Sequence, residues 1–397
     1  MPLTDIANRK TPSTPIEITF GAQPVATGTK FATLIGHKAA SGATAADFSV
    51  HVMQSVGDPV SAQKEVDLLA GTGSELGKMA YEFVQANAAV PGRSNFPAFR
   101  VVFLPNAEIA FGSSDDAITA IKLLRSDLIV SPYDASQATL LTKLTQLAAL
   151  ISGPDRDLNG QFGTTIIAGS IVASATALLF NVDNQYALIP YLQDTTGTPS
   201  QAPAIIAAGA AAVLLQSSFP YFPLDGAQVG GLLPPVNASD RIAVGPTELS
   251  ELALAAGLCP LQVDPAGRVK FIRTVTTRVT IDGTTPATAY FDWQDLVTLY
   301  DFREDTFLLL QQPQYKNKKA SIDQAKKVKD GILQLAQEYE DAQAFQAVKQ
   351  LAPQFIVQPS ASSRGRFDFK IPVNVIPGLH VTAGNIEATT LFDQFTL

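Results

Sequence analysis

The chain has 397 residues, of which 46% are apolar and only 16% are charged, and its formal net charge at pH 7 is −8. This length allows two domains or one large domain with arms, and the low charge predicts that much of the surface is covered by other subunits. The acidic balance excludes general binding to nucleic acid or to anionic membranes, which needs a basic face, and the single cysteine, Cys259, excludes a disulfide framework and a multi-cysteine metal site.

The first 20 residues predict an extended arm that finishes as a strand. Three prolines interrupt the stretch, and Ile16, Ile18 and Phe20 then alternate with polar residues. The alternative is a frayed tail. This end has no apolar signal region, and the longest apolar runs, 165–180 and 202–215, are too short and too rich in small residues to cross a bilayer. We therefore expect no membrane insertion.

A strand at 31–36 and a helix at 74–87 are predicted next. The connection before this helix partly matches a P-loop, but Thr72 stands where that motif needs glycine, and Met79 stands where it needs a hydroxyl to hold Mg²⁺. Ser74 is instead predicted to cap the helix. The packed face of the helix is predicted to carry Leu76, Met79 and Phe83.

Strands and helices alternate between residues 99 and 191, which is typical of a parallel or mixed sheet with covered faces. The expected strands are 99–104, 127–131, 164–168 and 186–191, and the expected helices are 115–125 and 135–151. Ligands of such sheets bind beyond the strands' carboxyl ends, which singles out Ser131 to Asp134. No nucleophile elbow or glycine-rich nucleotide motif accompanies these residues.

An alanine-rich helix is predicted at 202–216, and a proline-rich passage from Phe219 to Pro235 then predicts an extended strap or a domain boundary. A short helix at 248–256, stopped by Gly257, leads into strands at 261–263 and 269–276 that a turn at 264–267 joins. A strand at 289–293 and a helix at 295–311 follow.

A long amphipathic helix is predicted at 321–345. Six lysines precede it or lie in its first turns: Lys316, Lys318, Lys319, Lys326, Lys327 and Lys329. The acids Glu338, Glu340 and Asp341 come later in the helix, an order that opposes the helix dipole at about 0.3 to 1 kcal/mol per charge. The lysines are interpreted as a surface for a partner; the alternative is a solvated face. The chain ends with an alternating strand from Phe367 to Val375 and an extended segment, 379–395.

The order of these patterns resembles that of contractile tail sheath proteins. The main anchor is the helix ending in Ala-Ala-Gly, the hairpin with the sequence FIRTVTT at 271–277, and Tyr290-Phe291-Asp292. The stretch from Gly73-Ser74 to Met79, the segment IVSPYD at 129–134 and the proline-rich strap resemble further parts of the same family. The anchors are short and scattered over most of the chain.

The resemblance implies a compact mixed α/β fold with extended N-terminal and C-terminal β-arms. Its parts would be an arm at 1–20, an outer α/β domain at 21–218, a core domain facing the tube at 219–378 and an arm at 379–397. The arms would add strands to neighbouring subunits by β-augmentation. The residues implied in this exchange are Ile16, Ile18, Phe20, Leu391, Phe392 and Phe395, and the six lysines are implied to face the tail tube.

The family implies a structural subunit that polymerises helically around the tail tube and contracts to drive the tube through the host envelope. It would be assembled in the host cytoplasm, lie in the virion tail, and need no catalytic residue, cofactor or metal. Expected partners are copies of itself, the tail tube protein, and baseplate and tail terminator proteins, without nucleic acid. Two alternatives stay open: an α/β enzyme binding a small ligand between Gly71 and Lys78 or between Ser131 and Asp134, and a tail-tube or baseplate protein.

Overall fold

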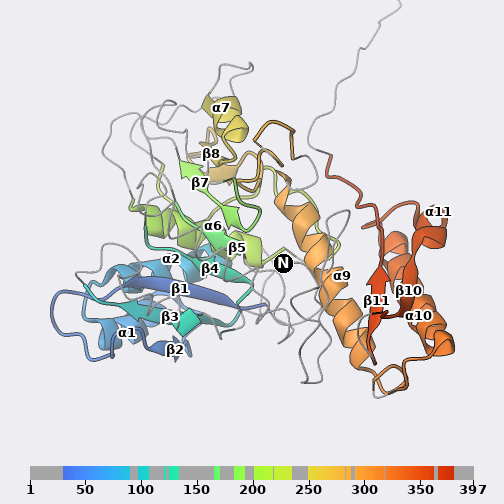
Figure 1. Cartoon of the computed structure of the whole chain (residues 1–397). Helices are drawn as coiled ribbons and strands as arrows, with labels where there is room; N and C mark the ends of the chain where they lie inside the picture. The colour runs from blue at the N-terminus through green and yellow to red at the C-terminus, as the bar shows by residue number, and fades with distance from the viewer. Residues whose placement is uncertain are drawn as a thin grey trace, which may run out of the picture.

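The computed structural model describes residues 30–89, 97–106, 120–121, 124, 126–133, 165–169, 183–192, 201–217, 219–234, 249–281, 283–287, 291–316, 318–361 and 365–379. These residues form an α/β body around a six-stranded sheet, a three-stranded sheet beside it, and a C-terminal body reached through the long helix α9 (Figure 1). In this part of the chain, no helix is long and apolar enough to cross a membrane.

The large sheet has the strand order β2-β3-β1-β4-β5-β6. Its strands are β1 (Ala32–His37), β2 (Val50–Val52), β3 (Phe99–Leu104), β4 (Leu128–Val130), β5 (Thr165–Ile167) and β6 (Ala187–Leu188). All neighbouring pairs are parallel except β2 with β3, which closes one edge in the antiparallel direction. The expected mixed α/β fold is therefore confirmed.

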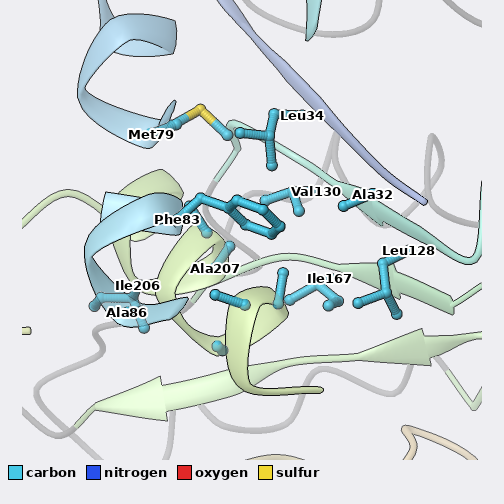
Figure 2. Packing of buried hydrophobic residues seen from close by; sticks show 14 of the residues in the cluster. Ala32, Leu34, Met79, Phe83, Ala86, Leu128, Val130, Ile167, Ile206 and Ala207 are labelled. Carbon is cyan, nitrogen blue, oxygen red and sulfur yellow. The ribbon is translucent and has the colours of Figure 1, made fainter. Parts of the chain in front are cut away.

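Helices α1 (Pro59–Ala70), α2 (Glu75–Ala88) and α6 (Pro203–Leu215) pack with this sheet. Ser74 caps α2 as predicted, because its Oγ accepts a hydrogen bond of 2.9 Å from the Gly77 N–H. Phe83 of α2 is fully buried and lies between the sheet and α6, near Val130 and Ala207 (Figure 2). The predicted packed face of α2 is therefore confirmed.

One buried side chain in this core carries a carboxyl group. Glu82 on α2 is only 3% exposed, and its Oε1 has no hydrogen-bond partner among the described residues. The backbone at Gly231 crosses directly over it, so that a Cβ there would lie 2.6 Å from this oxygen. Burial raises the pKa of Glu82 to about 8, and the folded protein therefore holds this group as a neutral acid at neutral pH.

Replacing Glu82 by Gln should stabilise the protein in a pH-dependent way. Between the ordinary pKa of 4.5 and about 8 the folded chain keeps a proton that the unfolded chain loses, so stability falls as pH rises. The increase in the free energy of unfolding caused by Glu82→Gln should be about 3 kcal/mol larger at pH 8 than at pH 5, measured by urea unfolding. The exposed control Glu251→Gln should show no such difference, and an equal gain at both pH values would contradict the assignment.

The second sheet joins β7 (Pro190–Leu192), β8 (Cys259–Val263) and β9 (Val269–Phe271), and α7 (Leu249–Ala255) contacts β8. The predicted turn between β8 and β9 is confirmed, since Asp264 Oδ1 accepts from the N–H groups of Ala266 and Arg268. The single strand expected at 186–191 is wrong. It is two short strands, β6 and β7, that belong to different sheets and therefore link them.

The sequence after β9 ties this sheet to α9 (Trp293–Gln311) rather than extending the strand to residue 276. Arg273 holds Asp292 with two hydrogen bonds of 2.8 Å, and Thr274 Oγ1 donates to Gln294 Oε1. The strand expected at 289–293 is wrong for residues 291–293, because Asp292 occupies the N-cap position of α9, without a side-chain capping hydrogen bond, and Trp293 is already helical. Residues 288–290 lie outside the described part.

The C-terminal body contains α10 (Ile322–Asp341), α11 (Val348–Leu351), the 3₁₀ helix η3 (Ala352–Gln354), β10 (Ile356–Pro359) and β11 (Phe367–Lys370). Its core includes Phe302 of α9, Ile332 and Tyr339 of α10, and Phe355. The strand expected from 367 to 375 ends at Lys370. The helix at 135–151 and most of that at 115–125 lie outside the described residues, and the domain boundary at 218/219 stays a prediction.

Candidate functional site

The six predicted lysines lie at one end of the C-terminal body. Three are in the connection from α9 to α10 and three are in the early turns of α10. Five are exposed and Lys329 is half-buried. These positions are compatible with the prediction that the six lysines share one surface. Their contact with the tube stays a prediction.

Local contacts hold the lysine-bearing connection against α10. Ser321 caps the helix by accepting from the Gln324 N–H at 3.2 Å, and the Gln324 side chain donates to the carbonyl of Gln314 at 3.0 Å. Tyr315 lies against Gly331, where a Cβ would come within 2.2 Å of the phenol oxygen. The residues on either side of the three lysines are therefore held against α10.

The charge of this surface is not balanced locally. Between residues 316 and 330 six lysines face only two acids, Asp323 and Asp330, in a chain whose net charge is −8. Among the described residues none of these lysines takes part in an ion pair or a hydrogen bond. Neighbouring like charges raise the free energy of the surface, and an acidic partner would lower it.

The second candidate surface is the small sheet of β10 and β11. The two strands are antiparallel, with Val357 opposite Phe369 and Pro359 opposite Phe367. In the described part of the chain this sheet has no third strand, and Ile356 at its edge is 47% exposed. A two-stranded sheet is marginal alone and offers unpaired backbone groups along each outer edge. Sequence reasoning missed β10, because a four-residue strand ending in proline gives little periodic signal.

The arm residues predicted to reach such an edge cannot be placed. Ile16, Ile18, Phe20, Leu391, Phe392 and Phe395 all lie outside the described residues. Their exchange between subunits stays a prediction.

The first alternative ligand site, between Gly71 and Lys78, is closed by an acidic side chain. Asp67 accepts hydrogen bonds from the Gly73 N–H at 3.3 Å and from the Ser74 hydroxyl at 2.9 Å. A carboxylate thus already uses the donors that a phosphate would need. The loop has the geometry of a helix cap that joins α1 to α2.

The second alternative site lies beyond the carboxyl ends of β1 and β4. Ser131 is fully buried, and its Oγ accepts from the Tyr133 N–H at 3.2 Å. His37, which sequence reasoning did not connect with this place, lies edge-on to Tyr133 with ring centroids 5.4 Å apart, and its Nδ1 pairs with Glu75 Oε2 at 2.5 Å. These contacts tie a strand end to α2. Asp134 lies outside the described residues, and no group of acidic, histidine or cysteine side chains in the described part could hold a metal ion.

Comparison with solved structures identifies the class of fold. The chain is similar to the sheath tail protein from Desulfitobacterium hafniense, with a TM-score of 0.56, 10% identity, and coverage of 91% of this chain and 100% of that one. It is also similar to a chain of the anti-feeding prophage baseplate, with a TM-score of 0.58, 12% identity, and coverage of 96% and 100%.

A third similar structure is the sheath complex of an extracellular contractile injection system in its contracted state, with a TM-score of 0.58, 10% identity, and coverage of 96% of this chain and 98% of that one. No family model and no curated protein matches the sequence. The chain therefore has the fold of contractile tail sheath proteins, as the resemblance in the sequence predicted.

Proposed function

We propose that this protein is the structural subunit of a contractile tail sheath. It polymerises helically around a tail tube, and its contraction drives the tube through the host envelope. The observation that carries this proposal is the likeness to sheath structures over 91 to 96% of the chain and 98 to 100% of theirs. The partners are copies of itself, the tube protein, and baseplate and terminator proteins, and the location is the tail of a virion or of a related injection particle.

Three features support this proposal over an enzyme. The loop between Gly71 and Lys78 is filled by Asp67. The β10–β11 sheet offers edges to which an arm from a neighbour can add a strand. The lysine-rich end of α10 suits an acidic partner, the role proposed here for the tube.

The proposal is tested by electron microscopy of negatively stained chain at rising concentration, alone and with the tube protein of the same particle. Hollow tubes or stacked rings are expected, because head-to-tail contacts that do not close produce an open helix. An enzyme would instead remain a monomer or a closed oligomer. A discrete species at every concentration, with and without the tube protein, would refute the proposal.

Replacing Lys326 and Lys327 by Glu should weaken assembly on the tube without unfolding the subunit. Both side chains are exposed and have no ion-pair partner among the described residues. Two charge reversals facing acidic groups should raise the concentration needed for co-assembly by about tenfold or more at low salt. Co-sedimentation with purified tubes measures this. The control Lys64→Glu and Lys78→Glu, on the α/β body, should leave co-sedimentation unchanged; equal loss in both pairs would favour the solvated-face alternative.

A further inference from the structure

The two bodies of the molecule have separate hydrophobic cores that meet along α9. The start of α9 packs in the α/β body through Trp293 and Val297, and from Leu299 onward the helix packs in the C-terminal body through Leu299 and Phe302. Figure 1 shows α9 running from one body to the other. Tyr221, in the strap after α6, packs against both cores.

A relay of polar side chains crosses this meeting point. Lys30, just before β1, donates to the Tyr221 hydroxyl at 2.6 Å, and this hydroxyl donates to Asp301 Oδ2 on α9 at 2.5 Å. One turn further along α9, Asp305 Oδ2 accepts from the Tyr339 hydroxyl of α10 at 2.6 Å. We call these five residues the α9 junction. They connect the first strand of the α/β body to the main helix of the C-terminal body.

The α9 junction is polar; Asp301 and Tyr339 are buried, and its other three residues are half-buried. Asp301 is 3% exposed, and a cavity of about 30 Å³ beside it is lined by further charged groups, among them Asp127 and Glu304. Burial, and next the Asp301 carboxylate, raise the pKa of Tyr221; burial and the Asp305 carboxylate likewise raise the pKa of Tyr339. Both phenols therefore stay protonated, and each donates a hydrogen bond to a carboxylate.

Such a junction restricts orientation more than an apolar contact would. Apolar surfaces can slide past one another at small cost, whereas buried hydrogen bonds to charged groups need particular distances and angles and are costly to leave unmade. The Tyr339 ring adds packing, since its centroid lies 4.9 Å from that of Phe219 in the strap and 5.2 Å from that of Phe302 in α9. The strap, α9 and α10 are thereby bound at one point.

We propose that the α9 junction is an orientation lock that holds the C-terminal body in one fixed position on the α/β body. Without it, the bodies would be joined by α9 and by the strap, and would change their relative orientation in solution. This inference concerns the single chain and does not depend on the proposed function. If the chain is also a sheath subunit, movement during contraction would lie between subunits rather than at α9.

The test measures the distance between spin labels on the two bodies in the full chain, diluted with unlabelled chain. Labels on Lys64→Cys in α1 and Lys327→Cys in α10 report orientation, since both positions are exposed. A reference pair, Lys64→Cys with Glu251→Cys in α7, stays within the α/β body. Cys259 is buried and burial raises its pKa to about 12, so it should not take the label.

If the lock exists, the distance between the labels at positions 64 and 327 should have one narrow distribution in the parent chain. In the double variant Tyr221→Phe/Tyr339→Phe this distribution should become broad or split. The reference pair should stay narrow, which shows that the α/β body remains folded. The buried tyrosine Tyr191, away from the junction, supplies the control Tyr191→Phe, which should keep the parental distribution. A broad distribution in the parent would overturn the lock in favour of a hinge, whatever the variants do, and a double variant with the parental distribution would overturn it as well.

Discussion

Removal of residues 1–20 should abolish tube formation while leaving a folded monomer. If this stretch adds a strand to a neighbouring subunit, its loss removes backbone hydrogen bonds between copies but none within the described cores, which lie between residues 32 and 375. The critical concentration for assembly should rise by at least about 100-fold, which corresponds to about 3 kcal/mol per contact. Sedimentation at increasing concentration measures it, and circular dichroism checks the fold.

A matched pair of variants separates an arm from a frayed tail. Changing Ile16, Ile18 and Phe20 to Ser should reproduce the loss, because these alternate residues would face the neighbour's sheet. Changing the intervening Glu17 and Thr19 to Ala should have little effect. Assembly of the shortened chain at the parental concentration would show that residues 1–20 are dispensable for exchange.

The second large effect is expected from Phe83→Ala. The ring is fully buried between the sheet and α6 (Figure 2). Its centroid lies 4.8 Å from that of Phe99 on β3. Truncation removes this contact and leaves a cavity, at a cost of about 3 to 5 kcal/mol in the free energy of unfolding. A domain of ordinary stability, about 5 to 15 kcal/mol, would lose a large part of it.

Urea unfolding of Phe83→Ala beside Phe222→Ala tests this expectation. Phe222 is 69% exposed, so its removal should change the free energy of unfolding by less than about 0.5 kcal/mol. Similar losses in the two variants would mean that Phe83 does not occupy the core position described here.

Where local pattern and tertiary packing agree, the sequence sufficed to predict the elements. Ser74 precedes α2 because its hydroxyl caps a helix with an apolar face, and 99–104 is a buried strand because all its side chains except Arg100 are apolar. The helix 202–216 was recognisable from composition, since α6 is apolar on all sides and lies between other elements.

The sequence-based predictions fail where contacts between residues distant in the sequence determine the secondary structure. Residues 186–191 were predicted as one strand, but Ile189 separates β6 from β7 as the chain passes between sheets. Asp292 lies in a stretch with strand-like neighbours, yet its pairing with Arg273 sets the start of α9. No local pattern could reveal the α9 junction, because Lys30 and Tyr221 are 191 positions apart.

In the candidate site, too, features carried by neighbouring residues could be predicted, whereas features that depend on distant residues could not. The six lysines could be predicted as a candidate partner surface because they are close in the sequence and their position early in the helix is unfavourable for its dipole. Only one strand of the β10–β11 sheet was predicted: the alternation at 367–375 indicated a strand, which ends at Lys370, whereas its partner at 356–359 was not recognised. The hydrogen bonds from the 71–78 loop to Asp67 could not be inferred, since Asp67 lies in α1, outside the sequence motif.

Sheath assembly can be observed in a helical reconstruction by cryo-electron microscopy, from the full chain assembled with the tube protein of its own particle. We expect a hollow cylinder of this chain, with the lysine-bearing end of α10 on the inner wall and strands from neighbouring copies beside β10 and β11. Subunits arranged in a closed ring of fixed size that does not surround the tube, or a cylinder with α10 on its outer wall, would contradict it.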